Sequence, residues 1–237
     1  MHIRIAKDYS AMSAQTADFI VAELNRRPDL LLCASAGGTP TGPYEQLGVR
    51  YSRQPRRFKK MRVVQIDEWI GLSPTHPATC RYDLQTKLLT PLSIDSSRFR
   101  GFKSDAADLQ RECKTMSQWL SKNGPIDICI LGLGLNGHIA MNEPGKELSP
   151  HVHVSKLTPQ SQTHAMLASL KRKPRHGLSL GMAEILSSRK ILLLVSGSGK
   201  KAILKRTLEP IVTTHLPATF LHLHPDVTVF CDRAAMK

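Results

Sequence analysis

The sequence predicts an α/β fold with a mostly parallel, Rossmann-like sheet and helices on both of its faces. Short apolar runs, each long enough for one buried strand, alternate with longer stretches whose apolar residues recur at helical spacing. Glycines and polar residues follow several of these runs directly, as in sheets that carry a site at the carboxyl ends of their strands. No repeat or long linker divides the chain, so we expect a single domain over residues 1–237.

The composition is that of a folded protein with an excess of positive charge. Of 237 residues, 41% are hydrophobic, and no apolar run reaches the roughly 18 residues that a membrane helix needs. The formal net charge of +14 is concentrated partly in residues 50–62 and 171–175. Because these runs lack interleaved aromatic residues, they favour a solvated face that attracts small anions over a surface for nucleic acid. We therefore expect neither a nucleic-acid partner nor a membrane partner.

The cysteine pattern indicates a reducing compartment. Five cysteines are scattered without a CxxC pair, which argues against a disulfide framework and a structural zinc site. His151 and His153 have a spacing that metal ligands can use, but no third ligand stands nearby. The N-terminal residues lack the apolar core of a signal peptide. These observations predict a cytoplasmic protein without a metal ion.

The first half of the chain begins with an alternating strand and an amphipathic helix. Apolar positions recur at helical spacing over residues 8–26, with Asp8 or Ser10 as the residue that caps the helix. A buried strand at 29–34 follows and leads through a small-residue loop into another helix. The remaining predicted elements of this half are a strand at 61–66, a helix that follows a Pro-rich turn within 74–89, a short strand at 99–102 and a helix at 105–120.

The loop after the strand at 29–34 has the features of a phosphate site. Gly37 and Gly38 expose backbone N–H groups, Thr39 adds a hydroxyl donor, and the following helix directs its positive end at an anion. It is not a Walker loop, because no Gly-Lys-Ser/Thr follows. An ordinary turn between a strand and a helix is the alternative.

Two carboxylates, Asp67 and Glu68, follow the strand at 61–66. Because successive strand residues face opposite sides, one carboxylate can point into a cleft while the other points elsewhere, for example to a salt bridge. Either residue could also be an ordinary surface charge.

Residues 128–145, ICILGLGLNGHIAMNEPG, organise the rest of the chain. A buried strand runs into glycines and then directly into His138, Asn142 and Glu143. A GxG after a strand is common, and no acidic residue ends a strand about 20 residues later, where a ribose partner would stand. We therefore expect no nicotinamide or flavin cofactor here.

The second half continues the alternation. The apolar run at 190–195 ends in glycines and Lys200, and a lysine at such a helix start can reach an anion held by backbone groups. Residues 159–176, polar and then basic, are expected to form a mobile lid. The other predicted elements are an extended segment at 149–156, a short helix at 183–186 and a last strand at 227–231.

Several stretches together resemble the glucosamine-6-phosphate isomerase (deaminase) family, in the order and with the approximate spacing of that family. They are SAGGTPTGPYEQL, QIDEWIGL with HPATC, GLGLNGHIAMNEPG, LSLGMAEIL, LLLVSGSGKKA and LPATFLHLHPD. Within the family the chain is most similar to the short, galactosamine-6-phosphate isomerase-like branch. The resemblance implies an isomerase/CoA-transferase-like sheet without a nucleotide or other cofactor. It also implies conversion of a 2-amino-2-deoxyhexose 6-phosphate to a ketohexose 6-phosphate and ammonia.

The resemblance also assigns roles to residues of this chain. It implies that Asp67 moves the C2 proton and that His138, supported by Glu143, opens the sugar ring. It places the substrate phosphate at Gly37, Gly38, Thr39 and Lys200. These roles suit the chemistry, since ring opening needs a group that titrates near neutrality and C2 deprotonation needs a carboxylate of raised basicity.

The chain departs from the family pattern at two places. Asn136 stands where family members of best-known mechanism carry Asp; it can hydrogen-bond His138 but holds no negative charge against it. The phosphate-contacting arginine of the family's lid falls near Met166 and Leu167, and we expect Arg172 or Arg175 to replace it.

Two other functions remain as alternatives at this point. One is a 6-phosphogluconolactonase-type hydrolase of the same fold, whose central motif continues differently after Gly-His. The other is a non-catalytic sugar-phosphate sensor, which would carry a DNA-binding helix-turn-helix ahead of the first strand, where we expect none. The sequence does not separate the gluco from the galacto epimer, nor a monomer from a homo-oligomer.

Overall fold

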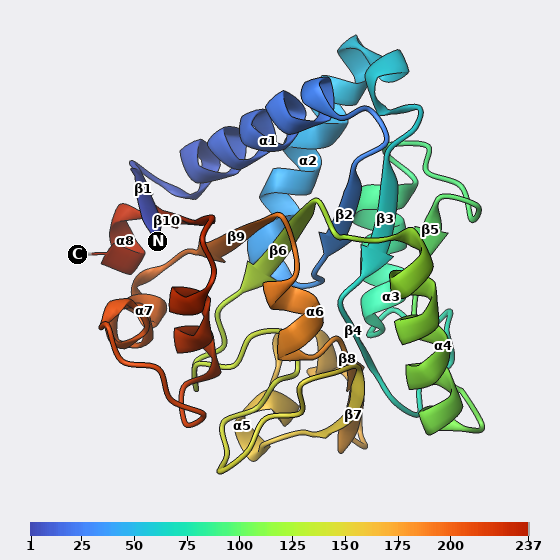
Figure 1. Ribbon diagram of the computed structural model, residues 1–237, viewed down its shortest axis with the longest axis vertical. Helices are drawn as coiled ribbons and strands as arrows, with labels where there is room; N and C mark the ends of the chain where they lie inside the picture. Colours follow the sequence, from blue (N-terminus) through green and yellow to red (C-terminus); the bar gives the residue numbers. More distant parts are fainter. Residues whose placement is uncertain (237) are drawn as a thin grey trace.

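The computed structural model describes residues 1–236 and contains a seven-stranded sheet in the order β1-β10-β9-β6-β2-β3-β5 (Figure 1). Every pairing in this sheet is parallel, so the predicted fold class is confirmed. β1 and β10, from opposite ends of the chain, pair with each other. The strands are β1 (His2–Ala6), β2 (Leu31–Ala34), β3 (Arg62–Gln65), β5 (Phe99–Arg100), β6 (Ile128–Gly132), β9 (Lys190–Val195) and β10 (Val227–Asp232).

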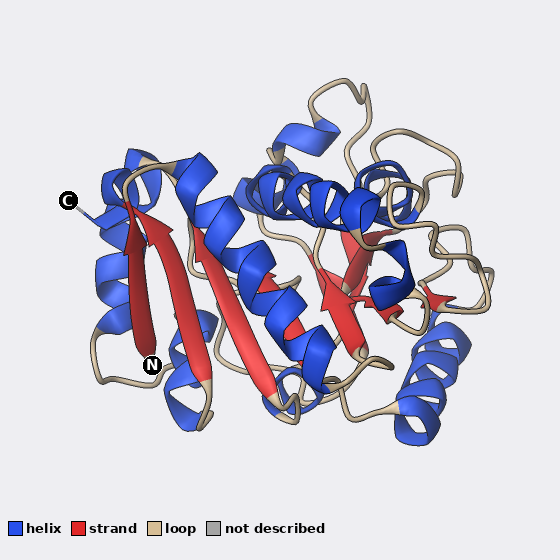
Figure 2. Cartoon of the chain, turned by 90° about the horizontal axis from the view of Figure 1, so that it is seen from above, coloured by secondary structure: helices blue, strands red, loops and turns tan. Residues whose placement is uncertain are grey.

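Helices cover both faces of the sheet (Figures 1 and 2). Alternation along the strands divides their apolar side chains between two cores, since Leu32 and Ile130 lie in one while Cys33 and Leu131 lie in the other. The first core includes α1 (Tyr9–Arg26), α2 (Gly38–Arg53) and α3 (Cys80–Leu84) with its π-helical continuation at Gln85–Leu89. The second includes α4 (Leu109–Asn123), α6 (Met182–Leu186), α7 (Lys201–Leu208) and the 3₁₀ helix Pro217–Leu223. Smaller helices are Pro55–Phe58, α5 (Pro159–Gln162), Ala165–Leu167, Ser198–Lys200 and α8 (Arg233–Met236).

Helix starts follow the capping residues more closely than the apolar pattern. Asp8 caps α1, as expected, through a 2.8 Å bond from the backbone N–H of Ala11. The helix predicted after the Pro-rich turn begins at Cys80, because residues 74–79 contain two prolines and Thr79 is the cap. The predicted start of α4 at residue 105 is wrong, since Asp108 caps that helix.

A second sheet of three antiparallel strands, which the sequence did not predict, lies below the carboxyl ends of the main sheet in Figure 1. Its strands are β4 (Asp67–Trp69), β8 (His176–Ser179) and β7 (His153–Lys156), in that order. Asp67 therefore does not end β3 but begins a strand of its own. β8 begins at His176, the last residue of the segment predicted as the lid, and a side chain at Gly177 would collide with Met141.

The strand order places a crevice between β2 and β6. The chain passes from β2 to β3 on one side and from β6 to β9 on the other, so the loops after β2 and β6 diverge. Open α/β sheets bind ligands at such a reversal, outside the carboxyl ends of the strands.

Glu68 connects β4 to the start of α3. Its side chain is fully buried and accepts hydrogen bonds at 2.8 to 2.9 Å from Trp69 N, Cys80 N, Arg81 N and Gln65 Nε2. A carboxylate can satisfy four donors at once, whereas an amide has only one oxygen.

We predict that Glu68→Gln lowers the free energy of unfolding by about 1 to 3 kcal/mol, because buried N–H donors lose their acceptor. Urea unfolding monitored by circular dichroism measures the change. The exposed Glu147 provides the control, and Glu147→Gln should unfold like the wild type. Equal stability of the two variants would contradict this account of Glu68.

Candidate active site

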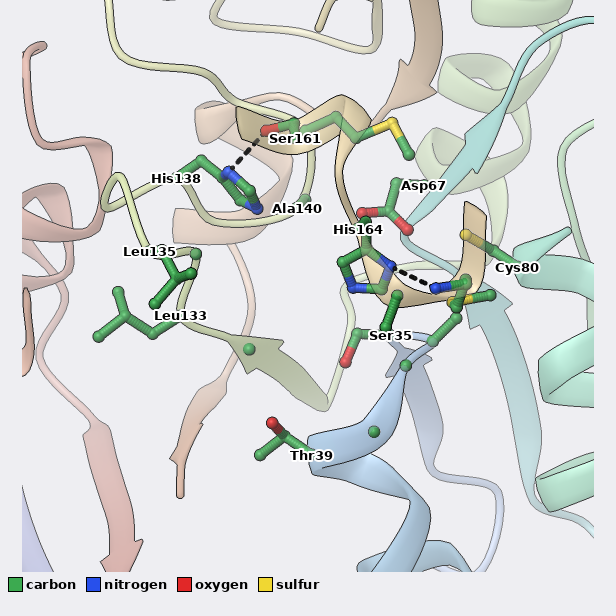
Figure 3. Close-up of a pocket in the computed structure, with 18 of the residues that line it drawn as sticks. Ser35, Thr39, Asp67, Cys80, Leu133, Leu135, His138, Ala140, Ser161 and His164 are labelled. Carbon is green, nitrogen blue, oxygen red and sulfur yellow. Dashed lines mark hydrogen bonds between the residues drawn. The ribbon is translucent and has the colours of Figure 1, made fainter. Parts of the chain in front are cut away.

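A cavity of about 290 Å³ opens at the carboxyl ends of β2 and β6 (Figure 3). Its walls come from residues 35–40 after β2, 132–143 after β6, the segment 160–166, the β4 residues Asp67 and Trp69, Cys80, Leu157, and Lys200 after β9. Seven of the eight predicted site residues line it: Gly37, Gly38, Thr39, Asp67, His138, Glu143 and Lys200. Asn136 lies behind the wall. Segments far apart in the sequence therefore meet at one site, as predicted.

Asp67 turns its carboxylate toward the cavity (Figure 3). Burial, followed by the charge of Glu68, raises the pKa of Asp67 to about 7. A hydrogen bond from Cys80 has the opposite effect but is the smallest of the three. The expectation that Asp67 and Glu68 point to different places is confirmed. Glu68 forms no salt bridge, however, because its oxygens are occupied by backbone and amide donors. Asp67 thus has the properties of a carboxylate base that works near neutral pH.

His138 lies on the other side of the cavity (Figure 3) and forms a pair with Glu143, which also lines the cavity. Nδ1 of His138 lies 3.6 Å from Oε2 of Glu143. Burial alone would raise the pKa of Glu143. A hydrogen bond with His138 and the charge of His138, followed by hydrogen bonds with Ser161 and Asn136, instead lower this pKa to about 2. Glu143 is therefore an anion that can stabilise a protonated imidazole.

Two glycines make room for this pair. A Cβ at Gly134 would lie 2.6 Å from the imidazole ring of His138, so the ring packs directly on the backbone there. Gly137 has a φ of +86°, in the region that side chains other than glycine's disfavour. The glycines of the central stretch thus position the histidine.

Asn136 supports Glu143 rather than the imidazole. Its Oδ1 accepts from the backbone N–H of His138 at 3.1 Å, and its Nδ2 donates to Oε2 of Glu143 at 2.9 Å. The expected hydrogen bond to His138 therefore goes to the main chain and not to the ring. An amide in this place can donate to a carboxylate, which an aspartate cannot.

Sequence reasoning missed two hydroxyls that complete this network. Ser161 Oγ lies 3.2 Å from Nδ1 of His138, and Thr158 Oγ1 donates to Oε2 of Glu143 at 3.0 Å. Thr158 also caps α5, and a threonine followed by Pro159 is a recognisable helix start. That signal locates the helix but not the direction in which its first turn faces.

The start of α2 and Lys200 form the other end of the cavity. No side chain caps α2, and Gly37 has a φ of +111°. Lys200 Nζ donates to the carbonyl of Leu133 at 2.5 Å, and burial lowers the pKa of Lys200. The loop before Lys200 is fixed by Asp232, which accepts from Gly197 N at 3.1 Å. Backbone N–H groups, a helix dipole and an ammonium group are a suitable environment for an anion.

The predicted replacement for the lid arginine is wrong. Arg172 and Arg175 are both exposed, and neither lines the cavity. They follow the residues of the lid that face the cavity, 160–166, and continue toward the surface and into β8. The lid instead contributes His164 to the wall, a residue that sequence reasoning did not single out.

The paired histidines are occupied within the protein. His151 Nδ1 lies 3.1 Å from Oε1 of Glu184, and His153 Nδ1 contacts the carbonyl of His151 at 2.9 Å. Over residues 1–236, no group of three or more His, Cys, Asp or Glu side chains is arranged to hold a metal ion. Within the same residues, no helix combines the length and apolar character needed to span a bilayer.

Comparisons with known proteins agree with this geometry. Residues 7–230 match the family model described as glucosamine-6-phosphate isomerases/6-phosphogluconolactonase. A glucosamine-6-phosphate deaminase of Geobacillus sp. (strain WCH70) is 38% identical over 98% of this chain and 93% of that relative. AgaI of Escherichia coli (strain K12), a proposed deaminase, is 35% identical over 92% of this chain and 86% of that relative.

Solved structures show the same relationship. A structure described as a monomeric glucosamine-6-phosphate deaminase superposes with a TM-score of 0.93 at 33% identity, over 99% of this chain and 98% of that one. The 6-phosphogluconolactonase of Trypanosoma brucei has a TM-score of 0.79 at 19% identity, over 99% and 97%, and thus shares the fold. Because both the family model and relatives of more than 30% identity cover nearly the whole chain, this protein belongs to the glucosamine-6-phosphate isomerase/6-phosphogluconolactonase family.

Proposed function

We propose that this protein is an isomerase/deaminase that converts glucosamine 6-phosphate or galactosamine 6-phosphate to the ketohexose 6-phosphate and ammonia. One observation carries the proposal. Asp67 and the His138–Glu143 pair line the same cavity, and its remaining end combines the uncapped start of α2 with Lys200. A proton-transfer site thus lies within reach of a phosphate site.

In the first step, His138 opens the sugar ring. The imidazole takes the proton of the anomeric hydroxyl and delivers a proton to the ring oxygen as the C1–O5 bond breaks, which leaves an aldehyde at C1. Glu143 holds the charged form of the ring, and Ser161 and Asn136 keep both groups in place. Such support orients the imidazole and stabilises the positive charge that it carries briefly.

In the second step, Asp67 moves a proton from C2 to C1. Removal of the C2 proton, together with transfer of a proton from the substrate ammonium group to O1, gives an enol amine. Return of the C2 proton to C1 then leaves an iminium at C2. Water then adds to C2, and ammonia leaves as the ketone forms. A carboxylate with a pKa near 7 is basic enough to take the C2 proton and acidic enough to give it back.

The phosphate fixes the sugar in the cavity. Backbone N–H groups at Gly38 and Thr39, the Thr39 hydroxyl and Lys200 supply donors and positive charge at one end. The reacting carbons C1 and C2 are then held near His138 and Asp67. Binding energy from the phosphate, which does not react, thereby positions the carbons that do.

The main alternative, a 6-phosphogluconolactonase-type hydrolase, has less support. Hydrolysis of a lactone needs a base that activates a water molecule and does not need one placed over C2. The similar lactonase structures share the fold at 19% identity, whereas the deaminase from Geobacillus is 38% identical. A non-catalytic sensor has no use for a carboxylate whose pKa lies near 7.

Substrate epimer, assembly and location extend this proposal. Named relatives support glucosamine 6-phosphate, and the resemblance to the galactosamine branch supports its epimer, so both belong in the assay. The similar structure described as monomeric supports a monomer. Five free, buried cysteines support a reducing location such as the cytoplasm.

The direct test is ammonia release from both amino sugar phosphates, with their N-acetylated forms and 6-phosphogluconolactone assayed in parallel. We expect ammonia from at least one free amino sugar phosphate and none from the acetylated forms. Asp67→Asn should lower kcat by roughly 10² to 10⁴-fold with little change in substrate binding, because it removes the base and keeps the shape. Release of acid from the lactone without ammonia from either amino sugar would overturn the proposal.

The rate should depend on the ionisation of Asp67. The base must be unprotonated, and its pKa is raised to about 7, so kcat should rise with pH up to about 7 and level off above it. Glu68→Gln removes the second cause of the raised pKa and should shift this rise to lower pH, whereas Glu147→Gln should not. Initial ammonia rates at saturating substrate from about pH 5 to about pH 9 measure the profile. A rate that is already level at about pH 5, as a carboxyl group with the ordinary pKa of about 4 would give, would contradict the role of Asp67.

Lys200→Ala should mainly weaken binding. Loss of an ammonium group at the phosphate should raise KM roughly tenfold or more and change kcat less. Lys201, the next residue along the chain, is exposed and does not line the cavity, so Lys201→Ala is a matched control. An unchanged KM in Lys200→Ala would remove Lys200 from the phosphate site.

A further inference from the structure

His164, in the lid, lines the cavity but has no part in the proton transfers described above. It lies directly before the 3₁₀ helix Ala165–Leu167. Figure 3 shows its ring on the same side of the cavity as Asp67 and Ser35. A polar ring in the wall of this cavity can contact a bound substrate directly.

One nitrogen of this ring is already used. Nδ1 of His164 accepts a hydrogen bond from the backbone N–H of Met166 at 3.3 Å. The ring also packs against Trp69, with ring centroids 5.7 Å apart. Because Nδ1 accepts, the proton of the neutral imidazole is on Nε2. His164 therefore presents a single donor in a fixed orientation.

That donor lies at the start of α2. A Cβ placed on Gly37 would be 3.7 Å from both Nε2 and Cε1 of His164. The backbone N–H of Gly37 is taken by Asp83 at 3.0 Å, so the donors that remain at this helix end begin at Gly38. Nε2–H thus adds a side-chain donor next to the helix end that we assign to the phosphate.

Two unpaired polar groups indicate that a ligand completes this wall. Ser35 is 7% exposed and Trp69 is 5% exposed, and both line the cavity. Neither Ser35 Oγ nor Trp69 Nε1 has a hydrogen-bond partner in the part of the chain that the structure describes. Buried polar atoms are nearly always paired in folded proteins. Their presence around His164 marks a place where a polar ligand binds.

The surroundings of His164 make it a neutral donor rather than a cation. Burial, followed by the positive charges of His138 and Lys200, lowers the pKa of His164, and the carboxylate of Asp83 opposes this shift. Protonation of Nδ1 would also abolish the bond from Met166. The positive charge at the phosphate then comes from Lys200 and the helix dipole, and His164 adds direction.

We propose that His164 is a phosphate-binding residue, whose Nε2–H donates a hydrogen bond to the substrate phosphate held at the start of α2. The proposal deepens the proposed function and rests on it, since the ligand is the phosphate of the same amino sugar. It assigns to the lid a direct contact with substrate, so that binding of the phosphate also holds the lid in place.

Two substitutions separate hydrogen bonding from packing. His164→Phe keeps an aromatic ring beside Trp69 but removes the donor, whereas His164→Gln removes the ring but keeps an N–H near the position of Nε2. Calorimetric titration with a hexitol 6-phosphate, an open-chain ligand that cannot react, measures affinity independently of turnover. We expect the Phe variant to bind roughly tenfold more weakly and the Gln variant to keep most of the affinity. The same order should appear in KM, with smaller changes in kcat.

The exposed His215, outside the cavity, gives the control, and His215→Phe should bind like the wild type. Wild-type affinity in His164→Phe, or a larger loss in His164→Gln than in His164→Phe, would overturn the proposal and leave ammonia release as the separate test of function. If the wild type binds the hexitol phosphate in a His164-dependent way but releases no ammonia, the proposed reaction fails and the phosphate contact stands. Absence of any binding to the wild type would overturn the phosphate contact.

Discussion

The hydrogen bonds that Glu68 accepts inside the protein hold the site together. Its carboxylate ties β4 to the first turn of α3 and thereby fixes both Asp67, one residue before it, and Cys80, whose backbone N–H it binds at 2.9 Å. The same buried charge helps to raise the pKa of Asp67. Two adjacent carboxylates thus have different tasks, because strand alternation sends one to the cavity and the other into the interior. Glu68 thus positions Asp67 and helps to raise its pKa.

The position of the cavity follows from the strand order. The loops after β2 and β6 diverge where the order reverses, and the space between them is closed from below by the small antiparallel sheet and the lid. Glycines stand where the backbone must leave room for a side chain or turn tightly, as at Gly134 under His138. The main sheet therefore provides the space, and the second sheet provides Asp67.

The parts of the structure that could be predicted are those with a local cause. The inner strands of the main sheet, β10, β9, β6, β2 and β3, are buried on both faces and read as apolar runs, and Asp8 marked its helix start. The small sheet could not be predicted, because its strands are three or four residues long and β4 pairs with β8 across more than 100 residues. The cavity residues near glycines were found from the sequence. Thr158, Ser161 and His164 were not, since their direction depends on how the lid folds back over the cavity.

The electrostatics of the cavity explain why an asparagine suits position 136. Glu143, with a pKa of about 2, is an anion beside His138, whereas Asp67 has a pKa of about 7. Environments that separate the pKa values of two carboxyl groups in this way suit the groups to different roles in proton transfer. A second aspartate at position 136 would set a like charge against Glu143 and would raise its pKa, whereas the Asn136 amide donates to it at 2.9 Å. Glu143 is therefore kept ionised chiefly by His138, and the neutral side chains of Ser161 and Asn136 add to this effect without placing a second negative charge beside it.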